Sequence, residues 1–161
     1  MSFEQRLIEL GLTLPNPPKP VATYVPYAQV GNLLFLSGVV PSRDGQIAYQ
    51  GKLGREYSKQ EGYEATKLTL LNALANIRLA VDSLNRVKRI VKMTGYVASH
   101  DGFSEQPAVI NGASDLLVEI FGDVGRHARV AVGVAELPLG VPVELELIVE
   151  ILPASSEFHF A

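Results

Sequence analysis

Apolar residues recur along this chain with two different spacings, which predict the positions of helices and strands. One set follows at steps of three and four residues, which places it on a single helical face: Leu70, Leu74, Ile77, Val81 and Leu84. Before it, Ser58 and Glu61 have the S-x-x-E spacing of a capping box, in which each side chain bonds the other's backbone N–H. The pattern predicts a helix over residues 59–84.

Two further helices are predicted from their ends and their apolar stripes. Ser2 can cap a helix over residues 3–10, which Gly11 can end. A helix over 106–121 has Ser104 as its cap candidate and Gly122 as its stop. Its apolar stripe is made of Val109, Ala113, Leu116 and Ile120.

Alternating or continuous apolar runs between turn residues predict the strands. Residues 21–30 and 33–38 flank the turn at Gly31-Asn32, and 46–51 follow a turn at Arg43–Gly45. In a strand over 87–99, one face carries Val91, Met93, Gly95 and Val97. A Pro/Gly turn joins two last strands within 126–152.

This order of elements predicts a two-layer α+β domain. The sheet is expected to be mixed and mostly antiparallel, with both long helices on one face. Residues 1–20 are expected to form an N-terminal helix and a proline-rich connector, residues 21–153 the domain, and residues 154–161 a tail.

The last two strands have unlike faces. Val130, Val132 and Val134 are expected under the helices, which places Arg129, Ala131 and Gly133 on the opposite, helix-free side. On the closing strand the residues opposite the core face mix carboxylates with apolar side chains, as at contacts between subunits: Glu144, Glu146, Ile148 and Glu150. Arg129 and Glu144 are therefore expected on one side, in a roomy gap shared by neighbouring chains. A solvated arginine and a rim carboxylate are the alternatives.

Composition narrows the class of protein. The 161 residues are 47% hydrophobic, which suffices for one core, and the net charge of −3 gives no general attraction to nucleic acid or membrane. No apolar run approaches the ~18 residues of a membrane span, and the first twenty residues are too polar for a secretory signal. There is no cysteine. A soluble, cytoplasmic protein is expected.

Four motifs together resemble the RidA/YjgF family. ARVAVGVAELP (128–138) is similar to its signature, and VPVELELIVEI (141–151) to its closing strand. YVPYAQVGNLLFLSGVVP (24–41) is similar to its opening hairpin, and NALANIRLAVDS (72–83) to its first helix. The resemblance covers residues 24–152 and implies a chorismate-mutase-like fold, a homotrimer and ligand clefts between subunits. It also implies hydrolysis of 2-enamines and 2-imino acids to 2-keto acids and ammonia, without a metal or organic cofactor.

The resemblance assigns roles to residues that match the family's motifs. Arg129 matches the carboxylate-binding arginine, Glu144 the glutamate that positions water or moves a proton, and Tyr24 the tyrosine that closes the site. Four further positions match residues that line the substrate: Ser37, Gly38, Asn111 and Ala131.

The chain also departs from the family pattern. Ala131 stands where cysteine is common, Val39 replaces a glutamine, and Gly133 replaces a larger residue. These changes keep open a non-catalytic protein that binds small carboxylates. RNA cleavage has less support, because the basic cluster in 86–92 lacks stacking aromatics. His100, His127 and His159 lack the spacing of metal ligands. His127 can share a face with Arg129, although a histidine there is more often a turn residue.

Overall fold

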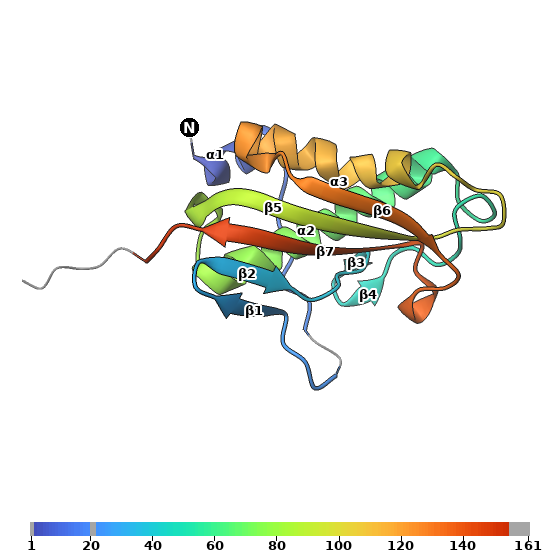
Figure 1. Cartoon of the computed structure of the whole chain (residues 1–161), viewed down its shortest axis with the longest axis horizontal. Helices are drawn as coiled ribbons and strands as arrows, with labels where there is room; N and C mark the ends of the chain where they lie inside the picture. The colour runs from blue at the N-terminus through green and yellow to red at the C-terminus, as the bar shows by residue number, and fades with distance from the viewer. Residues whose placement is uncertain (1, 20–21, 155–161) are drawn as a thin grey trace, which may run out of the picture.

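A computed structural model describes residues 2–19 and 22–154 of the chain. Two long helices, α2 (Lys59–Val81) and α3 (Gln106–Phe121), lie on one side of a five-stranded sheet, as Figure 1 shows. Its strands run in the order β1 (Tyr27–Val30), β2 (Leu33–Leu36), β7 (Val143–Ile151), β5 (Val87–Ala98) and β6 (Ala128–Val134). Only β5 and β6 are parallel neighbours among these strands. The predicted two-layer α+β architecture is confirmed.

Besides three short 3₁₀ turns, the described residues form one short helix and a two-stranded hairpin outside the main sheet. A short helix, α1 (Phe3–Glu9), precedes the sheet, and a separate hairpin is formed by β3 (Ser42–Arg43) and β4 (Gln46–Ile47). Asp44 has a φ of 50° in the turn of this hairpin, followed by Gly45 at 77°. The strand predicted over 46–51 is therefore much shorter, because it pairs only within this hairpin. The predicted C-terminal tail, apart from Ala154, lies outside the described residues.

The predicted start of α2 is confirmed and its predicted end is not. Ser58 accepts a hydrogen bond from Glu61 N, and the Glu61 carboxylate accepts one from Ser58 N at 2.8 Å. The helix ends at Val81, because Asp82 has a φ of 64° and leaves the right-handed region. Leu84 is nevertheless buried, because it belongs to a 3₁₀ turn that follows.

The predicted span of α3 and its buried stripe are confirmed, but its predicted cap is wrong. Glu105 occupies the N-cap position, and its side chain makes no capping bond. Pro107 in the first turn lacks an N–H, which leaves one donor fewer to satisfy there. Gly122, at a φ of 63°, ends the helix as predicted.

In strand β5, the prediction that Val91, Met93, Gly95 and Val97 share one face is confirmed for three residues and wrong for Val91. Met93, Gly95 and Val97 are buried as expected, but Val91 is only half-buried. The pairing with β7 is shifted between Ile90 and Lys92. Such an irregularity inserts a residue and changes the alternation, so Ile90 takes the buried position.

Helix α1 packs against α3 and the end of α2. The Phe3 and Phe121 rings meet edge to face with centroids 4.8 Å apart. Arg6 Nε donates to the carbonyl oxygen of Glu119 at 2.9 Å, and Leu84 N donates to Glu4 Oε1 at 2.8 Å. These contacts tie the N-terminal segment to the helical layer. The division of the chain near residue 20 remains a prediction.

Candidate active site

Strand β6 turns its faces the opposite way from the sequence-based expectation. Val130 and Val132 are 44% and 37% exposed on the helix-free face, whereas Arg129 pairs in register with buried Met93. Paired residues of neighbouring strands point to the same face. Arg129 therefore lies on the face that carries the helices. The hydrogen-bond register with β5 decides which side chains of the edge strand β6 face the helices, and it places the valines on the opposite face.

The Arg129 side chain is held by α3. Its Nη1 donates to Asn111 Oδ1 at 2.7 Å and to Ser114 Oγ at 3.1 Å. Asn111 and Ser114 are three residues apart, so both lie on one face of the helix. Within the described residues, no hydrogen bond engages Nε or Nη2 of Arg129. That edge of the guanidinium is a planar pair of donors that matches a carboxylate.

His127 lies behind this arginine and is not a simple turn residue. Its Nε2 lies 3.0 Å from Ser114 Oγ, and its Nδ1 lies 2.7 Å from the carbonyl oxygen of Gly125. Burial, and secondarily the charge of Arg129, lower the pKa of His127, while the Gly125 carbonyl opposes them. Ser114 was missed by the sequence analysis. Its spacing of three residues from Asn111 was the available signal.

Glu144 occupies a different place, on the helix-free face of β7. It pairs in register with Tyr96 of β5, and Tyr96 pairs with exposed Val132 of β6. A Cβ atom added to Gly38 would lie 2.0 Å from Glu144 Oε1. The segment after β2 therefore passes directly against this carboxylate, and a larger residue at position 38 would displace the Glu144 side chain. Ser37-Gly38 and Glu144 are brought together.

Burial raises the pKa of Glu144, and the neighbouring carboxylate of Glu146 raises it further. Tyr96 donates from its hydroxyl to Glu146 Oε1 at 3.1 Å. Burial also raises the pKa of Tyr96, and the bond to Glu146 adds to it. A carboxyl that binds its proton more tightly than usual suits proton transfer near neutral pH.

The predicted site residues thus form two clusters on opposite faces of the sheet. The arginine cluster comprises Arg129, Asn111, Ser114 and His127. The glutamate cluster comprises Glu144, Gly38 and Ser37. The expectation that Arg129 and Glu144 share one side is wrong, because their strands flank β5 with opposite alternation. A single chain does not place the two groups in one pocket.

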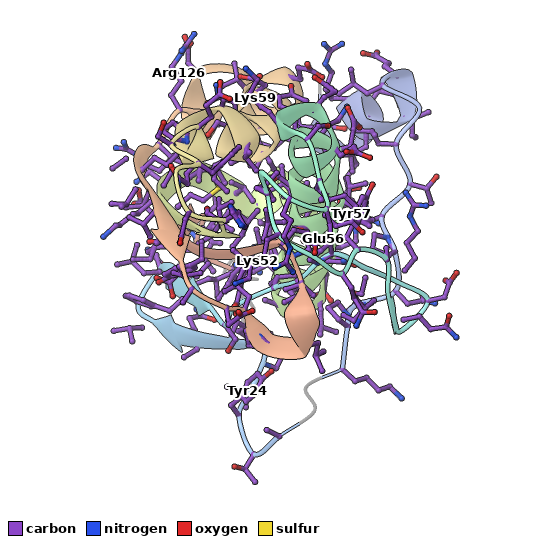
Figure 2. All side chains as sticks on the ribbon, turned by 90° about the vertical axis from the view of Figure 1, so that its right-hand side faces the viewer. Tyr24, Lys52, Glu56, Tyr57, Lys59 and Arg126 are labelled. Atoms are coloured by element: carbon purple, nitrogen blue, oxygen red, sulfur yellow. The ribbon has the colours of Figure 1, made fainter. Side chains whose placement is uncertain are left out.

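Tyr24 lies near the glutamate cluster in sequence but is half exposed. Its side chain is 50% accessible, and Figure 2 shows it on the loop at the far side from the helices. Ser37 is tied to the same loop, because its hydroxyl donates to the carbonyl oxygen of Val25 at 2.5 Å. Its N–H donates to the Pro26 carbonyl at 3.0 Å. Ser37 therefore fixes the loop that carries Tyr24.

The space expected beside Ala131 and Gly133 is not empty. Ala131 packs on the core, and a Cβ added to Gly133 would lie 2.8 Å from Gln106 Nε2. Gln106 in turn donates to the Phe103 carbonyl oxygen at 2.8 Å. The small residues of β6 thus accommodate α3 and its first side chain rather than an open gap.

The helix-free face mixes apolar and acidic side chains, as expected. Phe35 is 40% exposed there beside half-buried Ile148, its partner in the β2–β7 ladder. Val130 and Val132 extend this apolar surface to the edge strand, with Glu146 among them. Exposed apolar patches of this kind mark contacts with other molecules.

Features outside the two clusters bear on metal, membrane and nucleic-acid binding. Across residues 2–19 and 22–154, no group of three potential ligand side chains could hold a metal ion. No helix of that part is long and apolar enough to cross a membrane. In the basic cluster, Lys88 forms an ion pair with Glu150 at 2.8 Å, and Arg86 donates to the Leu152 carbonyl. His159 lies outside the described residues.

A mixed sheet with both helices on one face and an arginine held at its parallel edge defines a chorismate-mutase-like α+β protein. The family described as "YjgF/chorismate_mutase-like, putative endoribonuclease" matches residues 4–151. The chain belongs to this YjgF/RidA family.

Three relatives show how far the likeness extends. Protein TCP17 of Trypanosoma cruzi is 42% identical over 146 residues, which cover 90% of this chain and 91% of the relative. The crystal structure of Atu1372 from Agrobacterium tumefaciens, titled as of unknown function, is 44% identical with a TM-score of 0.87. The match covers 93% of this chain and 92% of that one. A protein of Dermatophagoides farinae named 2-iminobutanoate/2-iminopropanoate deaminase is 29% identical over 87% of this chain and 94% of its own.

Glu144→Gln is expected to raise the melting temperature at neutral pH. Folding raises the pKa of Glu144, so the stability that its protonated form contributes is lost as the pH rises from the ordinary value of 4.5 through the folded pKa. Glutamine does not ionise and removes that cost. Thermal unfolding at several pH values should show the gain at neutral pH and its disappearance in acid.

Glu150→Gln is the matched control, because Glu150 lies on the same strand and face. It forms an ion pair with Lys88 at 2.8 Å, so its replacement should give no gain. A Glu144→Gln variant that melts below the wild type at neutral pH would show that the charged carboxylate is not penalised.

Proposed function

We propose that this protein is a hydrolase that deaminates 2-imino acids to 2-keto acids and ammonia, at clefts where two copies of the chain meet. The observation that carries the proposal is the free edge of the Arg129 guanidinium, held by Asn111 and Ser114. Glu144 lies on the other face of the sheet, so the second cluster of each cleft comes from a neighbouring copy. A homotrimer in the cytoplasm is the proposed assembly, and no cofactor is needed.

The reaction follows from the chemistry of the two clusters. The Nε and Nη2 donors of Arg129 bind the substrate carboxylate and fix the C=N group. Glu144 of the neighbouring copy accepts a proton from water, whose oxygen bonds to the C=N carbon as the π electrons move to nitrogen. The proton then passes to nitrogen, which gives a neutral carbinolamine. Its hydroxyl proton moves to nitrogen as the C=O bond forms and the C–N bond breaks, so ammonia leaves and a 2-keto acid remains. The Tyr24 hydroxyl closes the cleft.

Two findings support the apolar, shared character of the cleft. The helix-free face carries exposed Phe35, Val130 and Val132, which a second chain would cover. Burial of Glu144 in such a contact would raise its pKa further in the direction that the single chain already shows. The relative from Dermatophagoides farinae, 29% identical, bears the name of the same reaction.

Arg129→Ala is expected to reduce ammonia release by at least about a hundredfold, because the charged bonds to the carboxylate are lost. The assay generates 2-iminobutanoate in situ and measures ammonia. Arg126→Ala is the control, since Arg126 points away from the molecule (Figure 2) and meets Asp123 at 3.4 Å. Equal turnover by Arg129→Ala and wild type would refute the proposal.

A second candidate is a protein that binds 2-keto acids without turnover. Val39, at the position of the family's glutamine, is 4% exposed and bridges to Leu145. Its side chain supplies no polar group to a ligand. Binding of 2-oxobutanoate by calorimetry, together with no ammonia release across several imines, would select this candidate.

A further inference from the structure

A chain of hydrogen bonds runs behind the Arg129 guanidinium, from α3 to the turn before β6. Arg129 Nη1 lies 3.1 Å from Ser114 Oγ, which lies 3.0 Å from His127 Nε2. His127 Nδ1 lies 2.7 Å from the carbonyl oxygen of Gly125, a buried residue. Ser114, His127 and Arg129 are each half-buried. The guanidinium is therefore supported on the side away from its free edge.

The carbonyl at the end of the chain sets the direction of the protons. A carbonyl oxygen only accepts, so His127 Nδ1 carries a hydrogen and donates to Gly125. In the neutral imidazole, Nε2 is then an acceptor, and the Ser114 hydroxyl donates to it. The lone pairs of Ser114 are left to accept from Arg129, which matches the observed contact.

A second proton on His127 reverses this arrangement. Nε2 then becomes a second donor to Ser114 Oγ, beside Arg129 Nη1, and the Ser114 hydroxyl hydrogen loses its acceptor. Two cations also face the same hydroxyl. Burial and the charge of Arg129 lower the pKa of His127, so the neutral form prevails at neutral pH. A protonated His127 therefore weakens the Arg129 contact, because two cations then face one hydroxyl.

The other charged groups around the imidazole are engaged elsewhere. On the turn before His127, Asp123 and Arg126 meet each other at 3.4 Å. On α3, Asp115 accepts a hydrogen bond from the Tyr63 hydroxyl of α2 at 2.9 Å. Among the described residues, Arg129 is the charged group that acts on the imidazole, and it opposes protonation.

We propose that Ser114 and His127 are positioning residues that hold Arg129 for carboxylate binding, and that protonation of His127 in acid weakens this binding. The inference rests on the proposed function, in which Arg129 binds the carboxylate. The two residues touch the arginine and its support rather than the ligand. They should therefore change the affinity for the carboxylate and its pH dependence.

The test measures binding of 2-oxobutanoate by calorimetry at several pH values between about 5 and 8. Ser114→Ala should weaken binding about tenfold at neutral pH, because one bond to a charged donor is lost. Ser114→Thr keeps the hydroxyl and should retain affinity. The wild type should bind more weakly in acid, whereas His127→Gln, which does not titrate, should give a flatter profile.

The Arg129→Ala variant distinguishes failure of the proposed function from failure of the positioning roles of Ser114 and His127. Binding that survives Arg129→Ala overturns the proposed function itself. Loss in Arg129→Ala, with Ser114→Ala equal to the wild type and His127→Gln showing the wild-type pH profile, overturns only the positioning roles. Titration of Glu144 or of the ligand affects the wild type and His127→Gln alike, so the difference between their profiles reports His127. Thermal unfolding of each variant checks that it is folded.

Discussion

Assemblies that mix Arg129→Ala chains with Glu144→Gln chains are expected to regain about a quarter of the wild-type ammonia release, although each variant alone releases almost none. The reason is that the two groups lie on opposite faces of one chain. A cleft shared by two copies is complete when its arginine comes from one variant and its glutamate from the other. Equal amounts of the variants are unfolded together, refolded and assayed for ammonia.

The same experiment distinguishes a shared cleft from a site within one chain. If Arg129 and Glu144 of one chain acted together, mixing the single variants would restore nothing. The control mixes wild type with the double variant. A shared cleft then retains about a quarter of the activity, and a site within one chain about half. Half activity in this control, with no restoration between single variants, would contradict the shared cleft.

Gly112→Ala is expected to destabilise the protein by about 2 kcal/mol or more, although alanine in a helix normally gains about 1 kcal/mol over glycine. A Cβ atom at Gly112 would lie 2.2 Å from the Tyr63 carbonyl oxygen and 3.3 Å from Thr66 Cβ. The carbonyl belongs to the backbone of α2 and does not move aside without displacing the helix. Denaturant unfolding measures the loss.

Gly62→Ala is the matched control on the same pair of helices. Its added Cβ would meet Leu53 Cδ1 at 2.5 Å and Val109 Cγ1 at 3.0 Å, which are ends of side chains. Rotamer changes can relieve those contacts, so the loss should be smaller than for Gly112→Ala. A gain in stability at Gly112 would mean that α2 and α3 approach less closely than the structure shows.

Local signals predicted most of the elements correctly. The capping box at Ser58 and Glu61, the stripe of α3 and the buried face of β7 depend on neighbours within a few residues. Hydrogen bonds and side-chain alternation act over that range, so spacing along the chain reveals them. The same signals failed at Ser104, where Glu105 takes the cap position, and at Val91, where a shift in the β5–β7 register changes the alternation.

The arrangement of the candidate site residues could not be predicted from the sequence, and their roles remain predictions. The residues matched to the family motifs include Arg129, Asn111 and Glu144, yet their grouping required the fold. Ser114 and His127 lie beside Arg129 because α3 passes next to β6 at that point. Ser114 and Arg129 are 15 residues apart in the sequence. Contacts of that separation leave no periodic trace in the sequence.

The sequence by itself determined the order of elements, the helix starts, and the positions of Arg129 and Glu144 near the starts of the last two strands. Only the tertiary structure decided which face each of these side chains takes. A run such as Arg129–Val132 alternates equally well with either set inward. The ladder with β5 sets Arg129 beside Met93, and the polar side of α3 supplies partners for the half-buried guanidinium.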